Sequence, residues 1–468
     1  MNTNLELKAL FYPRKIAVIG ATNTPGRVGG IIFDGLKGSS AERIPVHPKE
    51  NEVQGIPVVS SPELLPEEVD MAIITIGAEK AVTAAEQCAA RGVKIIVVIA
   101  GGFGEIGAKG KLLEDRLKAL PGRYGTRVLG PNSLGIFLPE TGLDTIFVEH
   151  GDKSLAGGGG IAFITQSGSV GVESLGYASN IGFGMRAFVG LGNKCDLNES
   201  DFLRYFAEDE KTRCLAIYTE NIDEGKAFLE EAGEVTRNKP VIVLKAGRSA
   251  AGEAAVSSHT GRLAGSDRVV GGAFRQYGIQ RAIDDEELAD AARVLSLIKP
   301  PRGNRIGVIT AAGGYGVMCA DYIEEPSRRA TLEMARFSDE TTARLKEVNL
   351  PFASTNNPVD ITASAGDEIY LQTVDALLDD PNTDILICIS FFAPPSITDD
   401  LIKGIAQRVK EGRKPITVFT QFGPFTDKYL KRFYQAGVPG YPSILRTVRA
   451  VRFLVERGEI LQTQGVLS

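Results

Sequence analysis

The strongest constraint on the fold is an alternation of short apolar runs with helical stretches, which begins three times along the chain. In the first series the runs at 16–19 and 71–76 are rich in isoleucine, and the segments 79–91 and 106–120 have the pattern and length of helices. Continuous apolar runs of this length are typical of parallel strands buried on both faces. The sequence therefore predicts an α/β fold built from doubly wound parallel sheets.

Two breaks divide this alternation. Four consecutive glycines, Gly157 to Gly160, precede the second series, and a Lys-Pro-Pro-Arg-Gly stretch at 299–303 precedes the third. Such segments stop helices and form turns. A chain of 468 residues is also too long for one core, because domains usually have roughly 100–200 residues. We expect three domains, at 1–150, 151–299 and 300–468.

Charge and composition disfavour several kinds of partner. Lys and Arg total 52 against 58 Asp and Glu, a net charge of −6 with no long run of one sign, and no apolar run is as long as a membrane span. We therefore expect no nucleic-acid partner and no membrane partner. The N-terminus has no export signal, the five cysteines lack C-x-x-C spacing and the three histidines lack metal-ligand spacing. These features favour a cytoplasmic enzyme without a metal cluster.

The turn after the first strand is rich in glycine and runs from Gly20 to Gly30. Glycines at a strand-to-helix turn let backbone N–H groups approach a phosphate at the N-terminus of the helix. The spacing is not G-x-G-x-x-G, which disfavours an NAD-dependent oxidoreductase and leaves another nucleotide, such as the phospho-ADP half of CoA. A purely structural turn is the alternative. The candidate ligand-binding residues here are Gly20, Ala21, Thr22, Pro25, Gly26, Arg27, Val28 and Gly29.

Two further candidates are expected at the same sheet edge. Lys49 follows the second strand, where a cation would meet an adenosine phosphate, although a solvated lysine is an equally natural interpretation. His47, two residues earlier, is more typical of a packed or exposed loop residue than of a catalyst. Asn132 offers an amide group after the strand at 127–129, but its segment alone indicates only a turn.

The second series begins with a strand at 161–165 that leads into a helix through small residues: Gln166, Ser167, Gly168 and Ser169. The backbone N–H groups in the first turn of such a helix form a good site for an anion. The G-x-S-x-G pattern of esterases is not met, so we do not expect a serine hydrolase. These four residues are candidate phosphate ligands.

His259 lies in a stretch of small and polar residues, 249–265, which predicts a long loop with no regular helix or strand. Long loops inside compact domains are often functional, and an imidazole nitrogen can accept and pass on a phosphoryl group. Taken alone, a histidine in such a loop is more often an ordinary exposed residue. Glu220 follows the strand at 214–219, where a carboxylate could orient an imidazole or merely cap a helix.

In the third series, the segments 310–316 and 357–360 also follow strands. They would either help to bind a phosphorylated group or only turn the chain.

Several motifs together identify a family. They lie at 258–261 with 263–265, at 166–168, at 130–132 and at 357–360. The chain resembles the α subunit of archaeal and bacterial ADP-forming acetyl-CoA synthetases, which are relatives of succinyl-CoA synthetase. The resemblance implies a Rossmann-like CoA-binding domain followed by two flavodoxin-like domains. It implies that His259 is phosphorylated, that Glu220 holds its ring and that residues 166–169 cradle the phosphate. The turn at 20–29, Lys49 and Asn132 would bind CoA.

The family reaction converts acyl-CoA, ADP and phosphate into acid, CoA and ATP through an acyl phosphate and a phosphohistidine. The resemblance implies that an ATP-grasp β subunit supplies the site for ADP or ATP with Mg²⁺, in an α2β2 heterotetramer, because the three series include no such module. Two departures concern the CoA edge: Gly77 stands where relatives usually carry proline, and Ser133 where many carry cysteine.

Two other functions stay open at this point. One is a non-catalytic CoA-binding regulator, against which His259 and Glu220 argue. The other is a succinyl- or malyl-CoA ligase subunit, which usually ends after the first two series. The sequence does not identify the acid, nor ADP against GDP.

Overall fold

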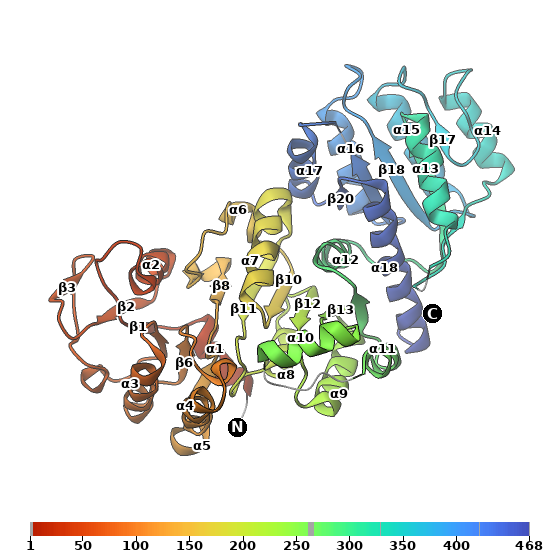
Figure 1. Ribbon diagram of the computed structural model, residues 1–468. Coiled ribbons are helices and arrows are strands. Elements are labelled where there is room, and N and C mark those ends of the chain that lie inside the picture. The colour runs from red at the N-terminus through yellow and green to blue at the C-terminus, as the bar shows by residue number, and fades with distance from the viewer. Residues whose placement is uncertain (1–2, 261–265, 328, 421, 468) are drawn as a thin grey trace. The chain divides into compact units, whose positions relative to one another are not determined.

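The computed structural model describes residues 3–260, 266–327, 329–420 and 422–467. It divides into an N-terminal unit, Met1–Ser179 with Gly184–Ile283, and a C-terminal unit, Asn180–Phe183 with Asp284–Ser468. The N-terminal unit contains two large sheets and a two-stranded one, formed by β3 (Glu52–Val53) and β4 (Ile56–Pro57), and the C-terminal unit contains one large sheet (Figure 1). The predicted α/β class with three mainly parallel sheets is confirmed, and the predicted strands lie within two residues of their expected ends.

The first sheet is parallel throughout and has the order β2-β1-β5-β6-β7. The strands are β1 (Lys15–Ile19), β2 (Glu42–Val46), β5 (Met71–Ile74), β6 (Ile95–Val98) and β7 (Arg127–Leu129). Helices α3 (Ala78–Ala90), α4 (Ala108–Lys118) and α5 (Leu120–Tyr124) pack on one face. The strand order reverses between β1 and β5, and in open α/β sheets ligands bind at the carboxyl ends of the strands at such a point.

The second sheet has the order β14-β13-β12-β10-β11-β8-β9. Its parallel strands are β10 (Ile161–Thr165), β11 (Met185–Gly190), β12 (Cys214–Thr219), β13 (Val241–Lys245) and β14 (Gln280–Ala282). Two short strands, β8 (Gly135–Leu138) and β9 (Leu143–Asp144), extend it with antiparallel pairing. The sequence did not predict β8 or β9, because β8 directly follows a segment interpreted as a turn and β9 has only two residues.

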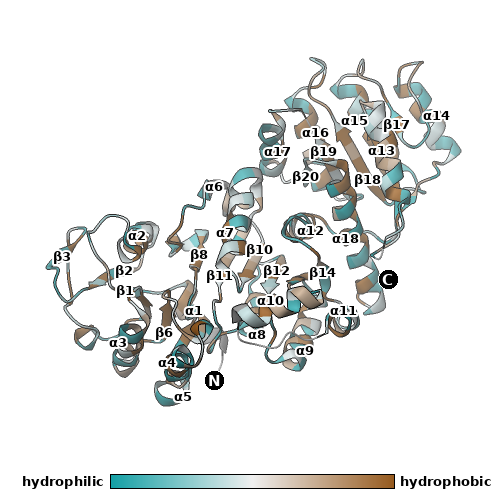
Figure 2. Cartoon of the chain, viewed as in Figure 1, coloured by the Kyte–Doolittle hydropathy of each residue, from teal (hydrophilic) through white to brown (hydrophobic). Residues whose placement is uncertain are grey.

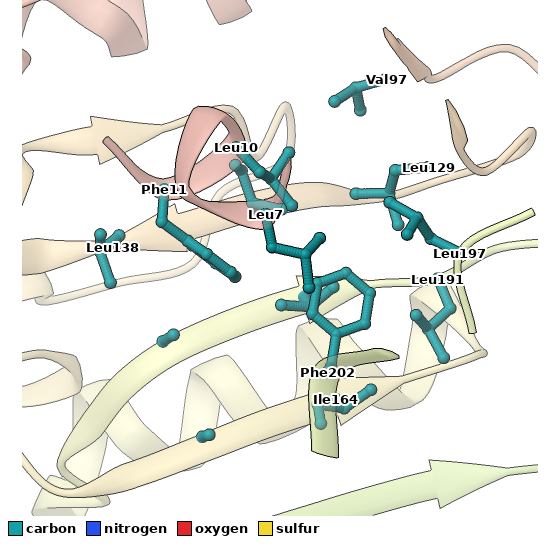
Figure 3. Close-up of a cluster of buried hydrophobic side chains, with 14 of the residues drawn as sticks. Leu7, Leu10, Phe11, Val97, Leu129, Leu138, Ile164, Leu191, Leu197 and Phe202 are labelled. Atoms are coloured by element: carbon teal, nitrogen blue, oxygen red, sulfur yellow. The ribbon is translucent and has the colours of Figure 1, made fainter. Parts of the chain in front are cut away.

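Helix α1 (Thr3–Phe11) lies between the two sheets of the N-terminal unit. Leu7, Leu10 and Phe11 are fully buried in one cluster with strand residues of both sheets, such as Val97 and Ile164 (Figure 3). Phe11 also contacts helix α8 (Glu199–Glu208), where its ring centroid lies 4.8 Å from Tyr205 and 5.3 Å from Phe206. A shared core of this kind makes the two sheets one compact unit.

The predicted loop at 249–265 is wrong where the chain is described. Residues Ala250–Thr260 form helix α10, and residues 261–265 lie outside the described part. Four alanines, the strongest helix formers, fall within these eleven residues. Small side chains alone do not indicate a loop, because alanine lacks the flexibility of glycine.

The third sheet is parallel and has the order β16-β15-β18-β19-β20, with β17 also paired to β15. The strands are β15 (Arg305–Thr310), β16 (Glu333–Met334), β17 (Val359–Asp360), β18 (Ile385–Ser390), β19 (Ile416–Thr420) and β20 (Gly440–Tyr441). Helices α13 (Gly313–Glu324) and α18 (Ile444–Thr463) cover one face, and α14 (Asp339–Val348), α15 (Asp367–Asp379), α16 (Asp399–Glu411) and α17 (Thr426–Gln435) cover the other. Helix α12 (Asp285–Leu297) packs against α18, where Arg446 pairs with Asp290 at 2.7 Å.

Hydropathy follows this layering. In Figure 2 strands such as β6 and β18 are brown, whereas α4 and α14 carry teal on their outer surfaces. Buried apolar strands beneath amphipathic helices are what the apolar runs predicted. Within the described residues, no helix combines the length and apolar character needed to cross a bilayer.

Candidate functional site

The glycine-rich turn after β1 brings two backbone segments close together. Gly20 has a φ of +93°, and a Cβ there would lie 2.7 Å from side-chain atoms of Thr75 and Ile76. A Cβ on Gly29, in helix α2 (Val28–Gly35), would lie 2.0 Å from the Gly20 carbonyl oxygen. Only glycine fits such a close approach, so α2 begins directly behind the end of β1.

A pocket of about 870 Å³ opens at this point of the first sheet, next to the ends of β1, β2 and β5. Six predicted residues line it: Gly20, Thr22, Arg27, Val28, Gly29 and Lys49. Of the other turn residues, Ala21 is buried, and Pro25 and Gly26 are exposed. Helix α3 adds Glu79, Lys80, Thr83 and Gln87 to the wall, which the sequence analysis missed because it considered only the turns. Arg27, Lys49 and Lys80 give the pocket three cations suited to phosphate groups.

The loop that carries Lys49 is held by His47 and Glu50. The Nδ1 atom of His47 accepts hydrogen bonds from the N–H groups of Lys49 (3.2 Å) and Glu50 (3.1 Å). The Glu50 carboxylate accepts from the Thr22 hydroxyl and from the Asn23 N–H (3.2 Å). The Thr22 bond is the main reason why the pKa of Glu50 is lowered. His47 therefore shapes the turn, in line with the interpretation of it as a packed loop residue.

Asn132 lies at the same edge of the sheet, after β7. Its N–H donates to the Ala100 carbonyl at 2.9 Å, and a Cβ on Gly101 would lie 3.2 Å from its Oδ1. A second pocket, of about 520 Å³, lies beside it and shares two residues of its wall with the first, Glu79 and Lys80. The wall of the second pocket comprises Gly77, Ala78, Glu79, Lys80, Gly101, Gly102, Ile106, Lys109, Gly110 and Leu113. The two pockets therefore adjoin along the strand ends.

The second sheet brings Gln166 and Glu220 together. The Gln166 Oε1 accepts the Glu220 N–H at 2.8 Å, and its Nε2 donates to Asn221 Oδ1 at 2.8 Å. The Gln166 N–H donates to the Tyr218 carbonyl at 3.0 Å. Its amide thus holds the turn that carries Glu220, a contact that the sequence did not predict.

Helix α7 (Gly168–Tyr177) begins next to this turn. Ser167 is its N-cap residue, and the hydroxyl groups of Ser167 and Ser169 lie 3.1 Å apart. Gly168 and Ser169 are exposed. The first N–H groups of a helix have no partner within the helix, and they carry a partial positive charge. An anion could bind here within reach of the Glu220 turn.

His259 is the penultimate residue of α10. Its side chain and the motif residues 261–265 lie outside the described residues. The buried Lys245 ends β13, the neighbour of β12, and its Nζ donates to the Ala246 carbonyl at 2.7 Å. Burial lowers the pKa of Lys245, and its ammonium group interacts with Glu220. Among the described residues, no group of three or more His, Cys, Asp or Glu side chains is placed to hold a metal ion.

Family models match three consecutive parts of the chain. A CoA binding domain matches residues 14–139, a succinyl-CoA ligase like flavodoxin domain matches 158–295, and a ligase-CoA domain matches 306–455. Each match covers the main strands of one of the three sheets.

The alpha subunit of acetate–CoA ligase [ADP-forming] II from Pyrococcus furiosus is 37% identical to the chain over 460 residues, covering 97% of the chain and 98% of that relative. The chain belongs to the family of ADP-forming acetate–CoA ligase alpha subunits. A longer relative, acetate–CoA ligase [ADP-forming] I from Archaeoglobus fulgidus, is also 37% identical over 460 residues, covering 98% of the chain but 65% of the relative. A solved structure of the dinucleotide forming acetyl-coenzyme A synthetase 1 from Ca. Korarchaeum cryptofilum, with phosphate and ADP, has a TM-score of 0.86 and 32% identity, and covers 98% of each chain.

The backbone at Gly77 is compatible with the residue that relatives usually carry, and Ser133 has a structural role. Gly77 has a φ of −56°, which is the conformation that a proline would adopt. The buried Ser133 donates from its hydroxyl to the Gly190 carbonyl (2.6 Å) and accepts the Gly135 N–H (3.0 Å), so it fastens the turn before β8 to β11.

The motif at 357–360 supports the backbone in this ligase subunit. Asn357 Oδ1 accepts the Val308 N–H at 3.0 Å, and its Nδ2 donates to the carbonyls of Ile306 (2.7 Å) and Ala335 (3.0 Å). Asn357 therefore ties β15 to the segment after β16. The sequence left two roles open for this motif, phosphate binding and a turn of the chain. For Asn357 the structure supports the role in the turn.

Proposed function

We propose that the chain is the CoA-binding, histidine-phosphorylated α subunit of an ADP-forming acyl-CoA synthetase. The enzyme interconverts acyl-CoA, ADP and phosphate with acid, CoA and ATP. The observation that carries this proposal is that Gln166 holds the turn of Glu220 next to the first turn of α7. The chain that contains this arrangement matches an acetate–CoA ligase alpha subunit over nearly its whole length.

CoA would bind along the carboxyl edge of the first sheet. The larger pocket carries Arg27, Lys49 and Lys80 and suits the phosphate groups of the nucleotide half. The smaller pocket is lined by Gly101, Gly102 and Leu113 and suits the neutral arm of the coenzyme. Asn132 stands beside it, on the side toward the second sheet.

His259 would act as the phosphoryl carrier. A ring nitrogen attacks the phosphorus of the acyl phosphate, an N–P bond forms, and the P–O bond to the acyl group breaks and releases the carboxylate. The Glu220 carboxylate accepts a hydrogen bond from the other ring N–H, which fixes the tautomer. The N-terminus of α7, with Ser167 and Ser169, offsets the charge of the phosphoryl group. An oxygen of the ADP β-phosphate then attacks the phosphorus, the N–P bond breaks and ATP is formed.

The nucleotide would bind to a partner. Relatives named as alpha subunits imply a partner subunit, and the Archaeoglobus fulgidus ligase carries additional chain beyond the matched part. We propose an ATP-grasp β subunit that holds ADP or ATP with Mg²⁺, in an α2β2 heterotetramer. The five buried cysteines are free thiols, which supports a reducing, cytoplasmic compartment.

The test is to mix the chain with its ATP-grasp partner and ATP labelled in the γ-phosphate, and to map the acid-labile, base-stable label by peptide analysis. We expect a label on His259 that acetate and CoA discharge. The variant His259→Asn should lose the label but keep CoA binding, while the matched variant His47→Asn should keep the label. No label on the wild-type chain with a competent partner would overturn the proposal and favour a CoA-binding regulator.

A further inference from the structure

Residues 191–197, the segment between β11 and α8, link the two sheets of the N-terminal unit, and we name them the strap. Leu191 and Leu197 are fully buried, and Figure 3 shows both in the same cluster as Leu129 of the first sheet. Both ends of the strap are therefore fixed in the core between the sheets.

The strap is bonded to the first sheet next to Asn132. The N–H groups of Asn193 and Cys195 donate to the carbonyls of Pro131 (2.8 Å) and Gly130 (3.0 Å). The Asn193 Nδ2 donates to Glu105 Oε2 at 2.6 Å, beside the smaller pocket. The position of the strap is thus set by the loops at the proposed CoA edge.

Lys194, the next residue, points toward the second sheet. Its Nζ donates to Glu199 Oε1 at 2.8 Å and to the Asn221 carbonyl at 2.7 Å. The side chains of Lys194 and Glu199 are 1% and 4% exposed. Burial of two charges is costly, and packing alone is often served as well or better by apolar residues. Lys194 also has a φ of +57°, which is uncommon for a residue other than glycine.

This pair fixes the backbone on both sides of Glu220. On one side the Thr219 hydroxyl lies 2.6 Å from Glu199 Oε1 and donates to it. On the other side Lys194 holds the Asn221 carbonyl, while Gln166 holds the Glu220 N–H. These three anchors fix the backbone from which the Glu220 side chain extends, and the Tyr218 hydroxyl donates to its carboxylate at 3.4 Å.

We propose that Lys194 is a positioning residue for Glu220, acting through Asn221 and the buried Glu199. The inference rests on the proposed function, in which Glu220 orients the ring of His259. When Lys194 holds the turn, the Glu220 carboxylate stays in line with the imidazole during phosphoryl transfer. Without Lys194 the Asn221 carbonyl keeps only the Thr219 hydroxyl, at 2.7 Å, and that hydroxyl is also engaged with Glu199. The turn is then held less firmly, and Glu220 samples other directions.

The test measures the rate of His259 phosphorylation in the assembled enzyme with labelled ATP. Lys194→Met alone leaves the buried Glu199 without a counter-charge and can fail to fold. The double variant Lys194→Met/Glu199→Leu removes both charges and replaces the two side chains with apolar ones of similar volume. Each rate is divided by the amount of chain that binds CoA in a calorimetric titration, which corrects for misfolded protein. We expect a 10- to 100-fold slower rate per CoA-binding chain, with the CoA dissociation constant changed less than threefold.

Two comparisons separate positioning from stability. The double variant Arg186→Met/Asp209→Leu removes another ion pair, between the buried Arg186 near the start of β11 and the half-buried Asp209, 2.8 Å apart. It should leave the rate per CoA-binding chain unchanged. Glu199→Gln leaves the buried Lys194 without a counter-charge, so its rate is also divided by the amount of chain that binds CoA. It keeps an oxygen acceptor for Lys194 and Thr219 and should recover most of the rate lost in the Lys194→Met/Glu199→Leu variant. A wild-type rate in Lys194→Met/Glu199→Leu would overturn the role of Lys194. A rate in Glu199→Gln as slow as that of Lys194→Met/Glu199→Leu would also overturn it. An unlabelled wild-type chain would instead refute the proposed function itself.

Discussion

At the scale of residues, the side chains of the candidate site are held in place by hydrogen bonds from neighbouring residues to the backbone. Gln166 holds the Glu220 turn, and His47 holds the loop of Lys49. In both cases a short motif near a proposed ligand site contains a side chain that forms hydrogen bonds with the backbone. The same holds for Asn357 in the third sheet. Motifs of this kind report the shape of a loop as well as its chemistry.

His150 provides a residue-scale prediction about pH. Its Nε2 lies 3.3 Å from Asp144 Oδ2, and its Nδ1 lies 2.9 Å from the Val148 carbonyl oxygen. Burial lowers the pKa of His150, but Asp144 and the Val148 carbonyl outweigh it, so the pKa is raised. A raised folded-state pKa gives stability that is present below the unfolded-state value of about 6.5 and is lost as the pH rises through the folded-state value.

We expect the free energy of unfolding of the wild-type chain to fall between pH 6 and pH 9 by more than that of His150→Gln. The two pH profiles should diverge because only the wild type loses a charged imidazole beside Asp144 as the pH rises. Denaturant unfolding at a series of pH values measures this divergence, with His47→Gln as the histidine control. Equal pH dependence in the wild type and His150→Gln would contradict this assignment.

At the scale of elements, helix ends carry the proposed anion chemistry. Helix α7 starts at Gly168 beside the Glu220 turn, and α2 starts at Val28 beside the CoA pocket. Helix α2 follows β1 and helix α7 follows β10, the first parallel strand of each sheet, so under the proposed function the same arrangement of strand, turn and helix would serve two phosphate groups. The alternation in the sequence placed both turns correctly.

Ser169→Asp tests the end of α7. An aspartate in the first turn interacts favourably with the helix dipole and should stabilise the chain by about 0.3–1 kcal/mol. The same charge should repel a phosphoryl group and slow the phosphorylation of His259 by about tenfold or more. Thermal melting and the labelled-ATP assay measure the two effects. The neutral variant Ser169→Asn is the matched control, and equal labelling of the two variants would speak against a phosphate site here.

At the scale of the whole molecule, the hydrophobic cores divide the chain into two units, whereas the alternation of strands and helices in the sequence predicts three domains. The first two sheets share one core, with α1 between them, whereas the third sheet has cores of its own on both faces. The two units should therefore respond separately to a change in either core.

Phe11→Ala tests this division. The Phe11 ring is fully buried between α1 and α8, and its loss should destabilise the N-terminal unit by about 3–5 kcal/mol. Hydrogen exchange should speed up in strands of the first and second sheets together and change little in the third. Phe433→Ala, in the core of the third sheet, should give the opposite pattern. Faster exchange in the first sheet alone would show that the two sheets are not one cooperative unit.

The sequence by itself determined the three α/β sheets, because apolar strands and amphipathic helices are local patterns that short segments carry within themselves. It also determined the position of the glycine-rich turn and, through its motifs, the ligase family. It failed for α10, because small side chains alone do not distinguish a helix from a loop, and for β8 and β9, because β8 follows a segment interpreted as a turn and β9 has only two residues.

Only the tertiary structure decided which side chains hold the site. Gln166 and Glu220 are 54 residues apart, and Lys194 reaches the Asn221 carbonyl across 27 residues. A lysine in a loop is ordinarily solvated, and nothing in the residues next to Lys194 indicates that it is buried against Glu199. Contacts of this kind depend on how strands order themselves in a sheet, because that order sets which loops meet at its edge.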